Sequence, residues 1–188
     1  MLGSQYYVTH PVFPLDRTVA DINVDAWPVL GRARDMTVIG AGKSQLEDDV
    51  KRVLSLQGRV LTAEATPQYG FYFRSDHFSF AKAGVPALIV GPGLDLIDGC
   101  RAAGRAGAAD YTAHRYHTPN DVFNPGWDLS GTLEDIQTLY LLGRNLADGG
   151  EWPDWYADSE FRARRDAMMS KRRQPAQTDG SPGAGGRP

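Results

Sequence analysis

The chain has 188 residues, of which 41% are hydrophobic and 23% charged, so it is long enough for one sizeable core and is not disordered throughout. Its net charge of −3 gives no electrostatic argument for binding nucleic acid or an anionic membrane, both of which usually need a concentrated basic face, and this favours small-molecule or peptide partners. No apolar run is long enough to span a bilayer, and the single cysteine, Cys100, has no partner for an internal disulfide.

The pattern of apolar residues predicts four strands. Residues 18–25 alternate between apolar and polar side chains, which is the period of a strand with one buried face. Residues 87–90 form an uninterrupted apolar run, as in strands that are covered on both faces. In chain order, the expected strands are residues 18–25, 36–39, 59–65 and 87–90.

Helices are expected between and after these strands. Ser44 and Glu47 have the spacing of a capping box in front of an apolar helical stripe. Ser75 or Asp76 is the expected cap of a second, short helix. The small residues of 98–113 are expected to form a long loop. The expected helices are residues 45–57, 76–83, about 132–147 and an exposed, basic helix at 162–173.

This alternation of strands and helices predicts a three-layer α/β domain, with helices on both faces of a largely parallel, mixed sheet. Ligands in such sheets gather at the carboxyl ends of the strands. We expect residues 1–150 to form the domain portion, and residues 151–188 to form a basic, Pro/Gly-rich tail that is partly disordered.

Several polar residues end predicted strands or stand on predicted loops. Asp25 ends the first strand, and Pro119 disfavours a helix around His117. Taken alone, each of these two side chains is more typical of a solvated loop than of a metal site. The run from Arg74 to His77 supports a functional and a structural interpretation equally. Ser75 is disfavoured as a nucleophile because no Gly-x-Ser-x-Gly turn surrounds it.

Four motifs, taken in order, resemble the C-terminal half of zinc-dependent aminopeptidases of family M28. They are Ala20–Asp25, Arg74–Phe80, Gly84–Ala87 and Tyr116–Asp121. The resemblance covers about residues 2–149 and implies the zinc-peptidase, phosphorylase/hydrolase-like fold. It also implies two zinc ions, held by two histidines and three carboxylates, and a further glutamate that acts as general base. Paired metal ions of this kind suit peptide hydrolysis.

The same resemblance implies a role for individual residues. Asp25 would be the carboxylate ligand of one zinc ion, and His117 the histidine ligand of the other. Tyr116 resembles the catalytic tyrosine that hydrogen-bonds the tetrahedral intermediate, and Arg74 a residue that lines the substrate cleft. The residues expected to support this site without touching metal are Asp76, His77 and Asp121.

The sequence departs from the family pattern at its N-terminus. The family's His-x-Asp motif and Glu-Glu pair precede the aspartate strand, and here only Leu2-Gly3-Ser4 remains of the stretch that follows them. We therefore expect an N-terminally truncated domain that binds zinc weakly and is inactive as this chain. Its full-length parent would be a metallo-exopeptidase that removes N-terminal residues from peptides.

Two alternatives remain open. The first is a non-catalytic relative of the M28 fold that binds a peptide or a protein. The second is a complete small α/β protein with an unrelated activity, which is disfavoured because central strands of the sheet would be missing. The chain has no signal-peptide pattern, and we expect the full-length parent to be exported, so the location of this chain stays open.

Overall fold

The structure, a computed structural model, describes residues 1–173 and contains one four-stranded sheet with the strand order β1-β4-β2-β3. β1 pairs with β4 and β2 with β3 in parallel, whereas β2 and β4 are antiparallel, with Val38 opposite Val90. This confirms the largely parallel, mixed sheet. The strands are β1 (Asp21–Val24), β2 (Asp35–Ile39), β3 (Val60–Ala63) and β4 (Ala87–Gly91).

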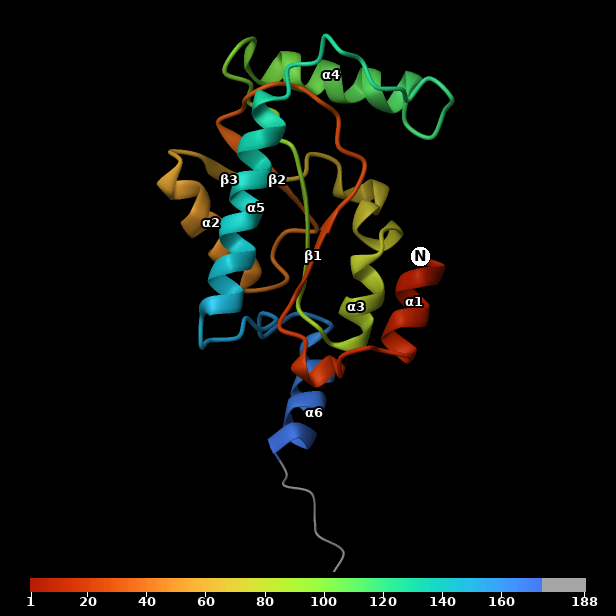
Figure 1. Ribbon diagram of the computed structural model, residues 1–188, viewed down its shortest axis with the longest axis vertical. Coiled ribbons are helices and arrows are strands. Elements are labelled where there is room, and N and C mark those ends of the chain that lie inside the picture. Colours follow the sequence, from red (N-terminus) through yellow and green to blue (C-terminus); the bar gives the residue numbers. More distant parts are fainter. Residues whose placement is uncertain (174–188) are drawn as a thin grey trace, which may run out of the picture.

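Helices cover both faces of the sheet, which confirms the three-layer α/β architecture. Figure 1 shows α2 and α5 on one side of the sheet and α1 and α3 on the other, with α4 across one end and α6 at the opposite end. The helices are α1 (Leu2–Thr9), α2 (Leu46–Leu56), α3 (His77–Ala83), α4 (Cys100–His114), α5 (Ser130–Asp148) and α6 (Arg162–Arg173). Within residues 1–173, no helix combines the length and the apolar character that crossing a membrane requires.

Each face of the sheet has its own hydrophobic cluster, because successive side chains of a strand point to opposite faces. Val38 and Val90 contribute to the cluster under α2 and α5, where Leu142 of α5 is fully buried. Ala87 and Ile89 contribute to the cluster on the other face. That second cluster is completed by Tyr72, Ala81, Trp155 and Phe161. A fully buried aliphatic or aromatic side chain stabilises the fold by about 1.5–3 kcal/mol.

Two helices are not predicted by the sequence pattern. The expected loop at 98–113 is wrong, because α4 occupies Cys100–His114. Only Gly104 of this helix is buried, so α4 has no apolar stripe for a periodicity argument to detect. A side chain at Gly104 would meet the carbonyl oxygen of Leu94 at 2.2 Å, so glycine permits this close packing. α1, the other unexpected helix, has no buried residue at all.

The expected helix caps are correct only in part. The Glu47 carboxylate accepts hydrogen bonds from the backbone N–H groups of Gly42 and Lys43, both at 2.8 Å, but the Ser44 side chain makes no capping bond. Neither Ser75 nor Asp76 caps α3 through its side chain. Instead, the Ser75 hydroxyl donates to Asp25, and the Asp76 carboxylate accepts from Ser4.

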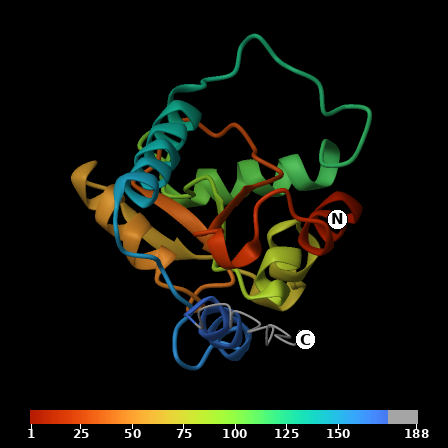
Figure 2. The same cartoon turned by 60° about the horizontal axis from the view of Figure 1, so that its bottom comes forward.

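The C-terminal segment packs against the domain. The helix expected at 162–173 is present as α6, and it comes forward in Figure 2. It is not fully exposed, because Arg165 is buried, as are Trp155 and Phe161 just before the helix. Residues 174–188 of the expected tail lie outside the described residues, and the boundary at residue 150 stays a prediction.

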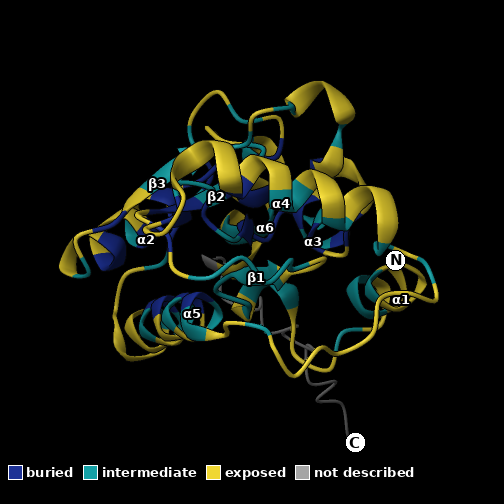
Figure 3. Ribbon diagram, turned by 90° about the horizontal axis from the view of Figure 1, so that it is seen from above, coloured by how far each residue is buried: buried dark blue, intermediate teal, exposed yellow. Residues whose placement is uncertain are grey.

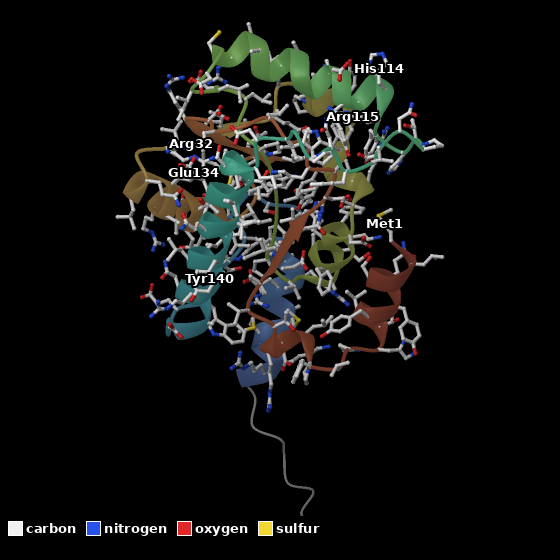
Figure 4. All side chains as sticks on the ribbon, turned by 45° about the horizontal axis from the view of Figure 1, so that its top comes forward. Met1, Arg32, His114, Arg115, Glu134 and Tyr140 are labelled. Carbon is white, nitrogen blue, oxygen red and sulfur yellow. The ribbon has the colours of Figure 1, made fainter. Side chains whose placement is uncertain are left out.

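One side of the domain is open. Among residues 1–173 no strand pairs with the outer edge of β1. Leu133, Ile136 and Tyr140 of α5 are each more than half exposed, so much of the apolar face expected for this helix is not buried. Figure 3 shows this outer side of α5 as exposed, together with most of α4. The start of α5 is held by an ion pair of 2.5 Å between Glu134 and Arg32, which point toward one another in Figure 4.

Candidate active site

A cavity of about 260 Å³ lies where β1 and β4 end, between the sheet and α4. This is the end of the sheet at which ligands of α/β proteins gather. The floor is formed by alternate residues of β2 and β4, namely Thr37, Ile39, Ile89 and Gly91. α4 contributes Ala108, Tyr111 and Thr112. The cavity is therefore mainly apolar, with polar groups on its walls.

Three of the residues expected in the site line this cavity. Asp25 follows β1, Arg74 ends the 3-10 turn Phe71–Arg74, and Tyr116 stands on the loop after α4. The fold thus collects a carboxylate, a guanidinium and a phenol from three separate segments. Arg74 is exposed and forms no ion pair within the described part of the chain. Cys100 is exposed and does not line the cavity.

The orientation of Asp25 is set by Ser75. The Ser75 hydroxyl donates a hydrogen bond of 2.7 Å to Oδ2 of Asp25, and it accepts one of 2.9 Å from Nδ2 of Asn23. Asn23 and Asp25 share one face of β1 because they are two residues apart. The sequence analysis missed this role of Ser75. The alternation of polar residues along 21–25 is the signal that points to a polar partner for this face.

His117 lies beside the cavity and does not line it. Its ring stacks on the ring of Tyr116, with 3.9 Å between centroids and 20° between planes. His117 is exposed, and its φ of 58° is in the left-handed region, which a residue other than glycine adopts at a cost of about 1–2 kcal/mol. His114 and Arg115, labelled in Figure 4, mark the end of α4 from which this loop departs.

Asp76 and His77 occupy different environments, although they are neighbours. Asp76 is exposed, and its carboxylate accepts a hydrogen bond of 2.6 Å from Ser4, which holds its pKa below the usual range. The amino group of Met1 lies 3.3 Å from the same oxygen, so Asp76 joins α1 to α3. His77 is fully buried, and its ring packs edge-on against Tyr72 at 4.6 Å. Burial lowers the pKa of His77 to about 4.

Asp121 is expected to orient His117, but its hydrogen bond is with Tyr111. Its Oδ2 accepts a hydrogen bond of 3.2 Å from the hydroxyl of Tyr111. Partial burial and this carboxylate raise the pKa of the Tyr111 phenol. Among the described residues no hydrogen bond joins Asp121 to His117, so its expected role in orienting that ring stays a prediction.

The donor set of the described residues does not fit the zinc ions that the resemblance implies. No group of three or more His, Cys, Asp or Glu side chains within residues 1–173 is arranged to hold an ion. Asp25 lines the cavity and His117 does not, and Glu64, which also lines it, accepts the backbone N–H of Gly40 at 2.9 Å. A catalytic zinc ion normally takes three protein ligands. No reaction step is therefore assigned to a metal held by these residues alone.

The comparison with protein families gives one match. The model described as Peptidase family M28 matches residues 1–140. No curated protein and no solved structure matches the chain significantly. The matched segment includes the whole sheet, the cavity and all the residues assigned from the four motifs. Because this segment is well over half of the 188 residues, the chain belongs to peptidase family M28.

Proposed function

We propose that this chain is the substrate-contacting part of a metallo-exopeptidase domain that removes N-terminal residues from peptides. Membership of peptidase family M28 supports a peptidase-like function. The observation on which the proposal rests is the cavity that brings Asp25, Arg74 and Tyr116 together at the carboxyl ends of β1 and β4. An apolar chamber with a few polar groups on its wall suits one side chain of a peptide.

The polar groups suit the two ends of a scissile peptide unit. The carboxylates of Asp25 and Glu64 favour a positively charged amino terminus. The Tyr116 hydroxyl is a donor for the carbonyl oxygen on which negative charge develops during hydrolysis. The exposed guanidinium of Arg74 is a further donor, for a backbone carbonyl of the peptide.

The proposal includes a requirement for further M28 elements. Two ligand candidates cannot hold a zinc pair, so the other ligands and the general base would come from another part of the domain. The unpaired edge of β1 and the exposed apolar side chains of α5 form a surface on which such elements could extend the sheet. We therefore propose that the chain alone is inactive.

A second candidate function is a non-catalytic domain that binds a peptide or a protein in the same cavity. It is favoured by one specific observation: the described residues contain no group of three metal ligands.

Hydrolysis of leucine 4-nitroanilide in the presence of zinc tests both proposals. The chain is compared with a longer chain that adds the His-x-Asp and Glu-Glu motifs upstream, and with the Asp25→Asn variant of that longer chain. We expect turnover only by the longer chain with Asp25. Turnover by the short chain would show that its catalytic residues are misassigned. A silent longer chain that still binds leucine peptides in calorimetry would support the binding domain.

A further inference from the structure

α6 buries a positive charge that has no carboxylate partner within residues 1–173. Arg165 is 2% exposed, and within the described part of the chain its side chain makes one hydrogen bond, a long one from Nη1 to the carbonyl oxygen of Thr18 at 3.4 Å. Its guanidinium carbon lies 5.5 Å from the ring centroid of Trp152. Burial lowers the pKa of Arg165. Buried charges are normally paired, because an isolated charge loses its hydration without compensation.

Arg59 shows how the same chain treats another buried arginine. This side chain is similarly buried, but it forms an ion pair of 2.5 Å with Asp135, which is also buried. Burial alone therefore does not explain why Arg165 lacks a carboxylate. A partner that is not part of residues 1–173 would supply the missing negative charge.

Arg165 lines a cavity of about 340 Å³ next to α6. In Figure 1, α6 is at the opposite end of the molecule from α4, and the cavity beside α6 shares no lining residue with the candidate active site. Ser170 offers a hydroxyl, while Pro153 and Met169 offer apolar surface. The volume is that of a small-molecule site.

The two carboxylates that line this cavity form ion pairs with a different arginine, Arg162. Asp154 and Asp166 also line it, and both pair with Arg162, at 3.3 and 3.0 Å. A second cation, Arg172, lies 4.4 Å from the centroid of the Trp152 ring; it donates a hydrogen bond of 2.9 Å to the carbonyl oxygen of Asp16 and forms no ion pair with a described residue. Within residues 1–173, neither of the two guanidinium groups beside Trp152 forms an ion pair, and of the two only Arg165 lines the cavity.

We infer that the cavity beside α6 binds a small oxyanion, with Arg165 as its principal ligand and Arg172 as a second positive charge. A planar guanidinium donates two parallel hydrogen bonds to a carboxylate or a phosphate group. Both groups present the negatively charged oxygens that would pair with the Arg165 guanidinium. The cavity also has room for a small organic body against Pro153 and Met169. This site is independent of the proposed peptidase function.

Thermal unfolding of the full chain tests the inference, with potassium phosphate or sodium acetate titrated against potassium chloride at constant ionic strength. At about 100 times the Kd, an anion that binds only the folded state raises Tm by roughly 5–10 °C in a protein of this size. We expect a saturable rise with at least one of the two anions, and its loss in Arg165→Gln. The control is Arg144→Gln, which removes an exposed arginine of α5 and should keep the full rise.

Arg172→Gln changes an exposed residue, so it tests the site even if Arg165→Gln does not fold. In calorimetry with the effective anion, we expect this variant to bind at least several-fold more weakly than the unchanged chain. A response to phosphate alone identifies a phosphate site, and a response to acetate alone a carboxylate site. If neither anion exceeds chloride, or if the Arg165→Gln and unchanged chains respond equally, the inference is overturned.

Discussion

The Ser75 hydroxyl donates a hydrogen bond of 2.7 Å to the Asp25 carboxylate, and this bond joins the segment before α3 to the end of β1. The same hydroxyl oxygen accepts a bond from Asn23, so one buried serine connects two polar residues of β1. The direction of Asp25 toward the cavity is thus fixed by a residue 50 positions away in the chain.

Replacing Ser75 with alanine is expected to destabilise the fold by about 1–3 kcal/mol, because the half-buried amide of Asn23 loses its acceptor and the Asp25 carboxylate loses its donor. Urea unfolding measures this change. Ser55→Ala is the matched control, since the exposed hydroxyl of Ser55 bonds only the carbonyl of Arg52. The control should change stability by less than about 0.5 kcal/mol. Equal effects of the two substitutions would contradict the structural role of Ser75.

Periodicity in the sequence predicts the elements that bury an apolar face. β2, α2 and β4 lie where they are expected, because each presents a stripe or a run of core residues. α4 has no such stripe and is invisible to the same reasoning. The resemblance to family M28 also selects Asp25, Arg74 and Tyr116, and all three line one cavity in the structure.

The sequence does not predict the contacts that depend on conformation outside regular elements. His117 takes a left-handed backbone conformation and stacks beside the cavity, a position that a loop sequence alone does not specify. Ser75 has the sequence signature of a helix cap, yet its hydroxyl bonds Asp25, because the fold places β1 next to the start of α3. Long-range pairing decides such cases.

Two buried groups are expected to give opposite pH dependences. Burial lowers the pKa of His77 from 6.5 to about 4, so only the unfolded chain binds this proton between these pH values. Stability therefore falls by up to about 3 kcal/mol as pH drops from 6.5 to 4. Burial raises the pKa of Asp21 from 3.8 to about 6, so the folded chain binds a proton first and stability rises as pH drops through 6.

The two effects oppose each other between pH 4 and 6 in the unchanged chain, and single substitutions should separate them. Asp21→Asn leaves the His77 effect, so its stability should fall steeply below pH 6.5. His77→Phe keeps a flat ring against Tyr72 and leaves the Asp21 effect, so its stability should rise toward pH 4. Urea titrations at pH 4, 5, 6 and 7 measure both, each as the difference from the unchanged chain. Parallel curves for the two variants would refute this account.

Two glycines of α5 are expected to respond oppositely to alanine. A side chain at Gly131 would meet the carbonyl oxygen of Gly31 at 1.8 Å, which is backbone that cannot yield easily. Gly131→Ala should therefore destabilise the fold by at least about 1–3 kcal/mol, the usual cost of overpacking. Gly143 has open space around it and lies inside the helix, so Gly143→Ala should stabilise by about 0.5–1 kcal/mol. Melting temperatures of both variants measure these changes. If both variants shift Tm in the same direction, or if Gly131→Ala raises it, α5 does not approach residue 31 closely.

Tyr116 and Tyr111 line the same cavity, and their hydroxyls offer a paired test of the proposed chemistry in the longer chain that the proposed function requires. If the Tyr116 hydroxyl donates to the developing oxyanion, Tyr116→Phe should lower kcat by about 10²–10³-fold with little change in KM, because the bond strengthens only in the transition state. The Tyr111 hydroxyl already donates to Asp121, so Tyr111→Phe should change kcat less than about 10-fold. Steady-state kinetics on leucine 4-nitroanilide measures both variants. If Tyr116→Phe keeps nearly the full kcat, or if Tyr111→Phe loses more kcat than Tyr116→Phe, then Tyr116 does not contact the oxyanion.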